Sequence, residues 1–263
     1  MKKTTRKIVI ANSKGGVSKT TTTNAMSAGL GRLNYKVLAI DLDPQGNLSD
    51  SIDLPDIENR TVYDLIKGEV TPYEVIQKGK YFDVIPANLD LASADLEITQ
   101  TGKEYRLKEQ LEKIEDDYDF IIIDTPPSLG ILTVNAFTYA DEVIIPTTAG
   151  IFATSGIKQL YQSIETVKRY CNPNLKVRGI LFTKYDKRTI ITSDIKELTE
   201  IYSKQIGVNI FNTHIRASIM VEEAQANKID IFSYNKENNV SKDYQKFIKE
   251  YLETNVKGED KND

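Results

Sequence analysis

Short apolar runs alternate along the chain with stretches whose apolar residues recur at helical spacing. The apolar runs lie at residues 7–11, 37–40, 82–85, 120–123, 143–145 and 177–182. The helical stretches include residues 20–33, 105–115, 155–170 and 193–206. The runs lack the polar alternation of a half-exposed strand, so we expect strands that are covered on both faces. Their order predicts an α/β fold, with a doubly wound, mainly parallel sheet and helices on both faces.

The chain has the features of a single domain. Its 263 residues are near the upper end for one domain, and neither an internal repeat nor a low-complexity linker divides them. We therefore expect one domain over residues 1–255 and a polar, frayed tail over 256–263. Apolar residues make up 40% of the chain and charged residues 27%, which excludes a disordered chain and a coiled coil.

Charge and composition limit the kinds of partner, cell compartment and metal site that we expect. The formal net charge is -4, so contact with nucleic acid requires a local basic patch. No stretch approaches the ~18 apolar residues of a membrane span, and no apolar region of a signal peptide follows the basic N-terminus. Cys171 is the one cysteine, which fits a plain thiol in a reducing cytoplasm. The one histidine, His214, has no second histidine for a metal site, so we expect it to be structural.

A segment rich in glycine and lysine follows the first predicted strand and opens the first predicted helix. It has the sequence NSKGGVSKTT over residues 12–21. In this position backbone N–H groups and the helix N-terminus can surround phosphate oxygens. Lys19 would place its charge on the outer phosphates, and the Thr20 hydroxyl would bind Mg²⁺. A glycine-rich turn with surface lysines is the alternative, because serines 13 and 18 replace both glycines of the strict motif.

Carboxylates follow two other predicted strands. The second strand ends in Asp41 and Asp43, which strand alternation places on the same side. The strand at 120–123 leads into Asp124, the Walker B pattern that holds Mg²⁺ through a water. Because ligands bind at the carboxyl ends of parallel strands, these groups would share one crevice with the loop. A nearby Mg²⁺ and Lys19 would offset the cost of burying carboxylates.

Together these motifs resemble the ParA/MinD family of P-loop ATPases, whose deviant loop carries an additional lysine directly before the glycine pair. The resemblance extends from residue 7 to about residue 252, and the sequence DLDPQGN over 41–47 is closer to the ParA branch than to the MinD branch. It implies the P-loop NTPase fold, ATP and Mg²⁺ as cofactors, and an ATP-bound sandwich dimer. In that family the early lysine, here Lys14, reaches the ATP of the partner subunit.

The resemblance also implies roles for single residues. Asp43 positions and polarises the attacking water, Asp41 supports the metal and phosphate network, and the sequence TPP after Asp124 senses the γ-phosphate. Ser18 replaces the family's glycine, and a positive φ there would cost ~1–2 kcal/mol and weaken nucleotide binding. The implied catalytic residues are Lys14, Lys19 and Asp43. The implied nucleotide-binding residues are Lys14, Gly15, Gly16, Val17, Ser18, Lys19, Thr20, Thr21, Asp41 and Asp186, and the implied Mg²⁺ ligands are Thr20 and Asp124.

The second half of the chain carries fewer motifs. The sequence TKYDKRT over 183–189 resembles the end of a family strand near the nucleotide base, which is the basis for Asp186. Arg188 matches an arginine that some relatives use for nonspecific DNA binding, and Lys187 and Arg216 are further candidates. A solvated loop charge is the alternative for Arg188.

Two further segments leave alternatives open. Residues 146–156 lack the acidic or glutamine residues that are common in the family, so this segment departs from the family pattern for contacts to the nucleotide or the partner subunit. The last predicted helix, 240–252, has an apolar stripe on one side and Lys242, Lys246 and Lys249 on the other. We expect it to pack on the sheet with a solvated lysine face. A lysine row that faces DNA and a membrane-bound helix are the alternatives, and the acidic tail disfavours the second.

The resemblance implies a ParA-type partition ATPase of a plasmid or similar element, with weak intrinsic activity. Its ATP-bound dimer would bind duplex DNA nonspecifically, and a centromere-binding partner of ParB type would stimulate hydrolysis and release. We expect a cytoplasmic protein that associates with the nucleoid in the ATP state, without a helix-turn-helix extension and without membrane contact. The alternatives are a MinD-like membrane-cycling ATPase and a small-molecule ATP-dependent ligase. A cluster-binding reductase would need more cysteines, and a tyrosine kinase would need clustered tyrosines.

Overall fold

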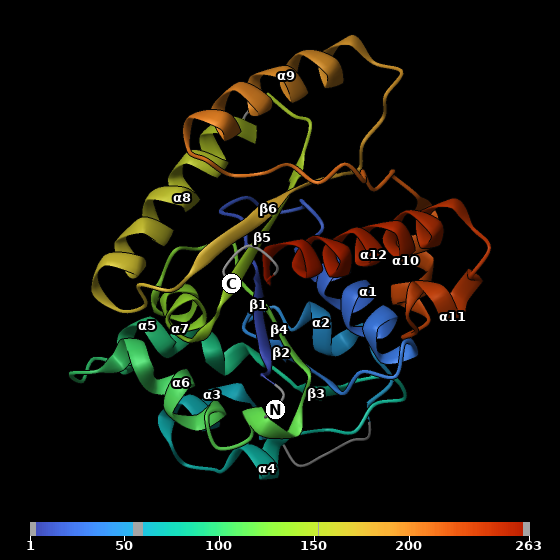
Figure 1. Ribbon diagram of the computed structural model, residues 1–263. Coiled ribbons are helices and arrows are strands. Elements are labelled where there is room, and N and C mark those ends of the chain that lie inside the picture. The colour runs from blue at the N-terminus through green and yellow to red at the C-terminus, as the bar shows by residue number, and fades with distance from the viewer. Residues whose placement is uncertain (1–3, 55–59, 152, 260–263) are drawn as a thin grey trace.

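Six parallel strands form the central sheet (Figure 1). The computed structural model describes residues 4–54, 60–151 and 153–259. The strands are β1 (Arg6–Ile10), β2 (Val37–Asp41), β3 (Asp83–Ile85), β4 (Phe120–Asp124), β5 (Glu142–Thr148) and β6 (Lys176–Thr183). Their order across the sheet is β3-β2-β4-β1-β5-β6, and every neighbouring pair is parallel. The predicted α/β class with a doubly wound sheet is confirmed.

Helices connect the strands and cover the sheet. Those of the first half are α1 (Lys19–Arg32), α2 (Asn47–Asp50), α3 (Val62–Lys67), α4 (Pro72–Val75), α5 (Ala94–Glu97) and α6 (Arg106–Leu111), with the short 3₁₀ helices η1 (Leu89–Ser93), η2 (Lys103–Tyr105) and η3 (Glu115–Asp117). Those of the second half are α7 (Ile131–Tyr139), α8 (Ala153–Tyr170), α9 (Ile190–Gln205), α10 (Ile219–Ala226), α11 (Ile231–Asn235) and α12 (Asn239–Glu259). No helix in the described part of the chain is long and apolar enough to cross a bilayer.

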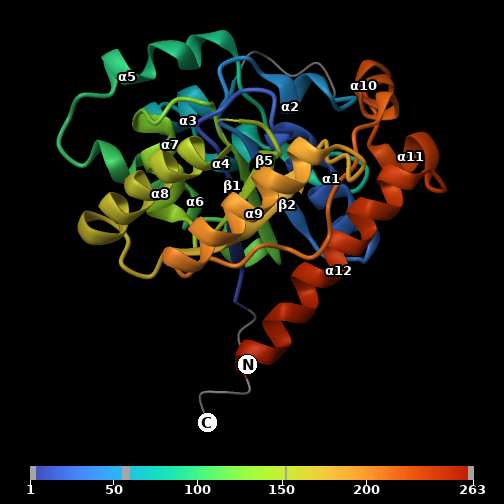
Figure 2. The same ribbon diagram turned by 90° about the horizontal axis from the view of Figure 1, so that it is seen from above.

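The sheet has a hydrophobic core on each face. Alternate residues of one strand point to opposite faces, so Ile8 and Ile10 belong to one core and Val9 to the other. Helices α1, α11 and α12 cover the first face, while α3, α6, α7 and α8 cover the second. Figure 2 shows the two helix groups on opposite sides of the sheet. Ile8, Val9 and Ile10 are 0% exposed, which explains why this part of β1 is a continuous apolar run.

Helix α12 packs against α1 through its apolar stripe. Tyr244, Phe247 and Tyr251 are 0% exposed, as the interpretation of a packed helix predicts. A Cβ on Gly29 of α1 would lie 2.2 Å from Cδ1 of Ile248, so the missing side chain lets the two helices approach. The helix extends to Glu259 and includes part of the segment where we expected a frayed tail. Residues 260–263 of that segment lie outside the described residues.

The helix predicted over 105–115 is shorter in the structure. Helix α6 ends at Leu111, and the separate turn η3 contains Glu115, Asp116 and Asp117. Acidic side chains are unfavourable at a helix C-terminus because the helix dipole is negative there, so this acidic run opposes continuation of α6. The predicted strands and the helices of the second half lie close to their expected positions.

Candidate functional site

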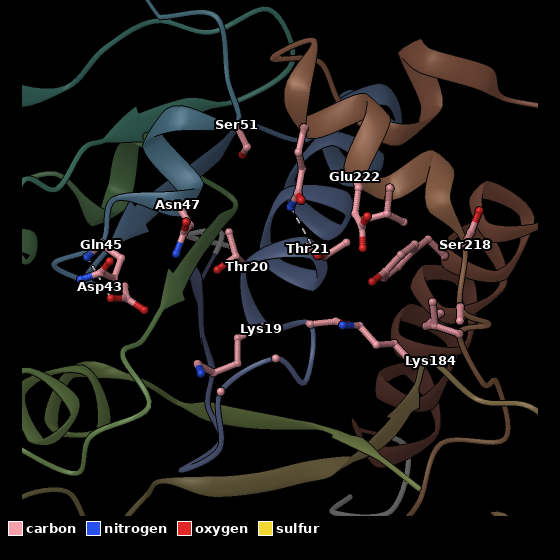
Figure 3. A pocket seen from close by; sticks show the side chains of 18 of the residues that line it. Lys19, Thr20, Thr21, Asp43, Gln45, Asn47, Ser51, Lys184, Ser218 and Glu222 are labelled. Carbon is pink, nitrogen blue, oxygen red and sulfur yellow. Dashed lines mark hydrogen bonds between the residues drawn. The ribbon is translucent and has the colours of Figure 1, made fainter. Parts of the chain in front are cut away.

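The glycine-rich loop between β1 and α1 lies at the carboxyl ends of the central strands. In the sheet register Asp124 pairs with both Ile10 and Asp41, so the ends of β1, β4 and β2 are level. A cavity of about 540 Å³ opens over the loop (Figure 3). The predicted nucleotide-site residues that line it are Gly15, Gly16, Ser18, Lys19, Thr20, Thr21 and Asp43.

The loop backbone leaves space for an anion. A Cβ on either Gly15 or Gly16 would meet no atom within 4 Å, so packing within the chain does not require these glycines. Gly16 has φ +72° and Ser18 has φ +65°, both in the left-handed region. This backbone turns the loop into the N-terminus of α1, where N–H groups without helical partners favour a negatively charged ligand.

Lys19 is held over this loop. The residue is 7% exposed, and its Nζ donates a hydrogen bond to the carbonyl oxygen of Lys14 at 3.2 Å. Burial lowers the pKa of Lys19, while Asp124 and Asp43 oppose that shift. The lysine therefore crosses the loop with carboxylates nearby, in a position to neutralise a phosphate that the loop holds.

Asp124 and Thr20 form the position that suits a divalent cation. Thr20 Oγ1 donates to Oδ2 of Asp124 at 2.6 Å, and Asp124 is 0% exposed. Burial raises the pKa of Asp124 to about 8, nearby Asp41 adds to the shift, and Thr20 and Lys19 oppose it. Oδ1 of Asp124 is buried and has no hydrogen-bond partner among the described residues. A buried carboxylate oxygen without a partner fits Mg²⁺, directly or through a bound water.

Asp41 and Asp43 have different environments although they are two residues apart. Asp41 is 0% exposed and accepts hydrogen bonds from the backbone and hydroxyl of Ser49, at 2.9 and 2.8 Å, and from the Asp43 N–H at 3.1 Å. Burial raises the pKa of Asp41 to about 6 in spite of these bonds. Asp43 lines the cavity, and its Oδ1 accepts the Gln45 N–H at 3.0 Å. Asp41 thus orders the segment that presents Asp43 to the cavity.

Lys14 and Val17 belong to the loop but do not line the cavity. The Lys14 side chain lies against α8, since a Cβ on Gly156 would be 3.1 Å from its Cε and 3.2 Å from its Cγ. Ser13 Oγ donates to the Gly156 carbonyl at 3.2 Å in the same contact. Val17 is 3% exposed, and its carbonyl oxygen accepts a hydrogen bond from Thr183 Oγ1 at 3.0 Å.

A second groove, of about 660 Å³, collects all three candidate DNA-binding residues. Lys187 and Arg188 come from the loop after β6, Arg216 comes from the segment before α10, and Lys246 of α12 joins them. Arg188 pairs with Asp186 at 2.7 Å, and Arg216 pairs with Asp243 at 2.6 Å. Two of the cations are therefore partly neutralised within the chain. Arg216 also lines the first cavity and so lies between the two.

Asp186 and His214 lie in this second groove. The structure does not bring Asp186 to the cavity over the loop, and Arg188 lowers the pKa of Asp186 to about 2. The His214 ring stacks on Phe182, with ring centroids 5.8 Å apart, and contacts Tyr185 in a tilted arrangement, with ring centroids 4.5 Å apart. Burial lowers the pKa of His214, so a neutral, packed ring agrees with the structural role expected for it.

Residues of α2 and α10 also line the cavity, and no motif in the sequence indicated this. Asn47 and Ser51 lie on one side of α1, with Ser218 and Glu222 on the other (Figure 3). Ser218 caps α10 by accepting the Met220 N–H at 3.3 Å, so a serine before an apolar run was the signal for this helix. Lys184, with φ +49°, also faces this cavity.

Comparison with known proteins gives a consistent set of relatives. A family model described as an AAA domain matches residues 5–177. The chromosome-partitioning ATPase Soj of Treponema pallidum (strain Nichols) is 36% identical over 248 residues, which are 93% of this chain and 96% of that protein. The chromosome partitioning protein ParA of Caulobacter vibrioides (strain NA1000 / CB15N) is 35% identical over 253 residues, 94% of each chain.

A solved structure with a different activity in its name is also similar. Cobyrinic acid a,c-diamide synthase from Mycobacterium smegmatis, with bound ADP and magnesium, superposes with a TM-score of 0.80 and 34% sequence identity over 93% of each chain. The similarity covers 93% of each chain, so proteins whose names give different activities share this fold.

Proposed function

This chain belongs to the family of the ParA and Soj partition ATPases, and from that membership we propose that it hydrolyses ATP to partition a plasmid or similar DNA element. One observation carries the proposal: Lys19, Thr20 and Asp43 line one cavity over the glycine-rich loop, and Thr20 is hydrogen-bonded to the buried Asp124 behind it. Solved relatives with ADP and magnesium bound support ATP and Mg²⁺ as the cofactors of this cavity.

Each of these residues would have a distinct task. The loop N–H groups and the Lys19 ammonium bind the outer phosphates, and Thr20 and Asp124 hold Mg²⁺. Bound Mg²⁺ would neutralise charge that develops on the phosphate oxygens during transfer. Asp43 lies in the same cavity and would orient the attacking water. Asp41 acts through Ser49 and the Asp43 N–H, so it positions Asp43.

The dimer and its partners form the second part of the proposal. Lys14 would leave its contact with Gly156 and reach the ATP of a second copy. The second groove, lined by Lys187, Arg188, Arg216 and Lys246, would contact DNA phosphates without sequence preference, with Arg216 linking it to the nucleotide cavity. A centromere-binding partner of ParB type would stimulate a weak intrinsic activity. This cycle would place the protein in the cytoplasm, on the nucleoid in its ATP state.

A small-molecule ligase is the second candidate function. The observation that favours it is the 34% identity and TM-score of 0.80 to the cobyrinic acid a,c-diamide synthase. The groove of basic residues beside the nucleotide cavity favours the partition ATPase instead. A MinD-like membrane cycle is less well supported, since the apolar residues Tyr244, Phe247 and Tyr251 of α12 are buried against the rest of the fold. Flotation with anionic vesicles tests that alternative directly.

Two variants test the proposed ATPase. Lys19→Ala should abolish ATP binding in calorimetry, with Lys168→Ala in the last turn of α8 as the matched lysine control. Asp43→Ala should retain ATP binding while hydrolysis falls by ~10²-fold, as for a lost general base. Duplex DNA and ATP together should support hydrolysis in the wild type. Hydrolysis that requires a small carboxylic acid and an amide donor instead would support the ligase, and unchanged ATP binding by Lys19→Ala would contradict the loop assignment.

A further inference from the structure

The loop between β4 and α7 lies beside the nucleotide cavity and is fixed at its far end by a residue from another helix. Pro127 of this loop lines the cavity. Helix α7 begins at Ile131, and its N-cap is Gly130, which has no side chain to cap the helix. The Ile131 N–H donates instead to Oδ1 of Asp95 at 2.6 Å, and Asp95 belongs to α5.

Gly130 makes room for this carboxylate. A Cβ on Gly130 would lie 2.5 Å from Oδ2 of Asp95 and 2.8 Å from Oδ1, closer than real atoms approach. The φ of Gly130 is -83°, which any residue can adopt, so the backbone conformation does not demand glycine. A side chain at this position would therefore displace the Asp95 carboxylate from the Ile131 N–H.

Two side-chain hydrogen bonds hold the loop to the elements next to it. Thr125 Oγ1 donates to the Ile10 carbonyl at 3.0 Å, and Thr133 Oγ1 donates to the Ser128 carbonyl at 2.7 Å. The first bond joins the loop to β1, and the second joins α7 to the loop. The Asp95 bond connects the loop to η1 and α5. Leu91 of η1 and Ala94 of α5 are 0% exposed in the same core as α7. A charged acceptor at the N-terminus of α7 also interacts favourably with the helix dipole.

We propose that Asp95 is a positioning residue for ATP hydrolysis, which holds the loop at 125–130 in the position that completes the nucleotide cavity. The inference rests on the proposed ATPase function. Asp95 acts through the Ile131 N–H and the start of α7, and not on the nucleotide. Loss of this tie therefore leaves ATP binding by the glycine-rich loop intact and lowers the rate of the hydrolytic step.

The test compares substitutions on both sides of the contact in the full chain. Asp95→Ala and Gly130→Ala should each lower kcat by roughly tenfold, the effect expected from one charge-assisted hydrogen bond, and should change the Kd for ATP by less than about threefold. Asp95→Glu should recover part of kcat. The double variant should be no slower than Asp95→Ala, because the added Cβ then meets no carboxylate. Asp64→Asn is the matched control, since the Asp64 carboxylate accepts the Thr61 N–H at the start of α3.

The outcomes separate this inference from the proposed function. A wild-type protein that does not bind ATP would overturn both. A wild type that hydrolyses ATP, with kcat unchanged in Asp95→Ala and Gly130→Ala, would overturn the inference alone. A fall in kcat that is matched by Asp64→Asn, or that adds fully in the double variant, would also overturn it, because a general loss of stability gives that pattern. If Asp95→Ala does not fold, Gly130→Ala carries the same comparison.

Discussion

At the scale of single residues, the site contains two side chains in states that side chains of their kind usually avoid. Ser18 has φ +65° and ψ +33°, and its side chain makes no capping hydrogen bond to α1. Asp124 is fully buried next to another buried carboxylate, Asp41. Such departures are typical of functional sites, where the surrounding structure holds an unfavourable state because the ligand needs it.

The strain at Ser18 predicts a stabilising substitution. A left-handed conformation costs a residue with a Cβ ~1–2 kcal/mol, and glycine gives back ~0.5–1 kcal/mol through the greater freedom of the unfolded chain. Ser18→Gly should therefore raise the free energy of unfolding by about 0.5–1 kcal/mol. Urea denaturation measures this change, with Ser18→Ala as the control that keeps the Cβ. Equal stability of the glycine and alanine variants would contradict it.

Burial of Asp124 predicts an unusual dependence of stability on pH. The pKa of an aspartate in the unfolded chain is about 3.9, whereas that of Asp124 is raised to about 8. Between these values the folded protein retains a proton that the unfolded chain has lost, so this group lowers stability as the pH rises from about 4 to about 8. Asp124→Asn should therefore be more stable than the wild type at pH 8 without Mg²⁺, by on the order of 2 kcal/mol.

Denaturation in urea at pH 6 and pH 8, with a chelator present, checks this expectation. The advantage of Asp124→Asn should shrink toward pH 6. Added Mg²⁺ and nucleotide should stabilise the wild type more than the variant. Asp64→Asn, at a half-buried carboxylate that accepts the Thr61 N–H at the start of α3, controls for removal of a hydrogen-bonded charge away from the site. A wild type that gains stability relative to Asp124→Asn between pH 6 and pH 8 would contradict the prediction.

At the scale of elements, the sequence predicts the strands and motifs that depend on local pattern. It does not predict features that depend on contacts between distant parts of the chain. Continuous apolar runs predict all six strands because both faces of this sheet are covered. The glycine-rich loop, Asp43 and Asp124 are found because each is a local motif at a strand end. Helix α6 lies inside its predicted range but ends at Leu111, and the place of α10 at the cavity was not predicted because it depends on packing between distant segments. The contact of Asp95 with Ile131 joins residues 36 positions apart, so no local pattern reveals it.

In the second groove, ion pairs within the chain determine which of the candidate DNA-binding cations remain available. Of the three lysines on the polar side of α12, Lys242 pairs with Glu237 and Lys249 with Glu253, whereas Lys246 lines the groove. Arg188 is held by Asp186, but the side chain is 84% exposed, and such surface pairs contribute little. Its guanidinium can therefore turn to a phosphate at small cost.

Charge reversal in this groove tests the DNA contact. Arg188→Glu should weaken binding of unrelated duplexes to a similar extent and should leave ATP-dependent dimerisation intact. Each lost phosphate contact should also reduce the slope of log K against log salt by ~0.9. A salt titration by fluorescence anisotropy, with ATP and with ADP, measures both effects. Arg169→Glu in the last turn of α8 is the matched charge reversal outside the groove. Full DNA binding by Arg188→Glu would contradict a role for Arg188 in the DNA contact. Lys246→Glu would then be the next variant to test.

At the scale of the whole molecule, both cavities lie at the end of the sheet where the strands finish, and Arg216 lines both. The other end is closed by a different cluster. There Arg6 pairs with Glu142 at 2.8 Å, Tyr251 donates to the same carboxylate at 2.7 Å, and the Arg6 guanidinium stacks over the Tyr251 ring. One end of the molecule is thus tied together by side chains, while the other presents the loop and the basic groove.

Because Lys14 lies in the glycine-rich loop at the carboxyl ends of the strands, we predict that substituting it affects dimer formation and not nucleotide binding. Lys14→Ala should bind ATP in each monomer, because Lys14 does not line the cavity, but should fail to form the ATP-dependent dimer. Size-exclusion chromatography with light scattering, run with ADP and with a slowly hydrolysed ATP analogue, gives the mass in each state. Lys158→Ala on α8 is the control. A dimer of Lys14→Ala in the analogue would contradict the role proposed for this lysine.

The central position of β1 also has a consequence for synthesis of the protein. The first strand pairs with β4 and β5, and Arg6 meets Phe120, 114 positions later in the chain. At ~5–20 residues per second, a ribosome needs roughly 6 to 25 s to make the intervening chain. During that time Ile8, Val9 and Ile10, which are 0% exposed in the finished fold, have neither of their neighbouring strands. The nascent N-terminal half therefore offers an apolar strand with two open edges to chaperones and to other nascent chains until β4 leaves the ribosome.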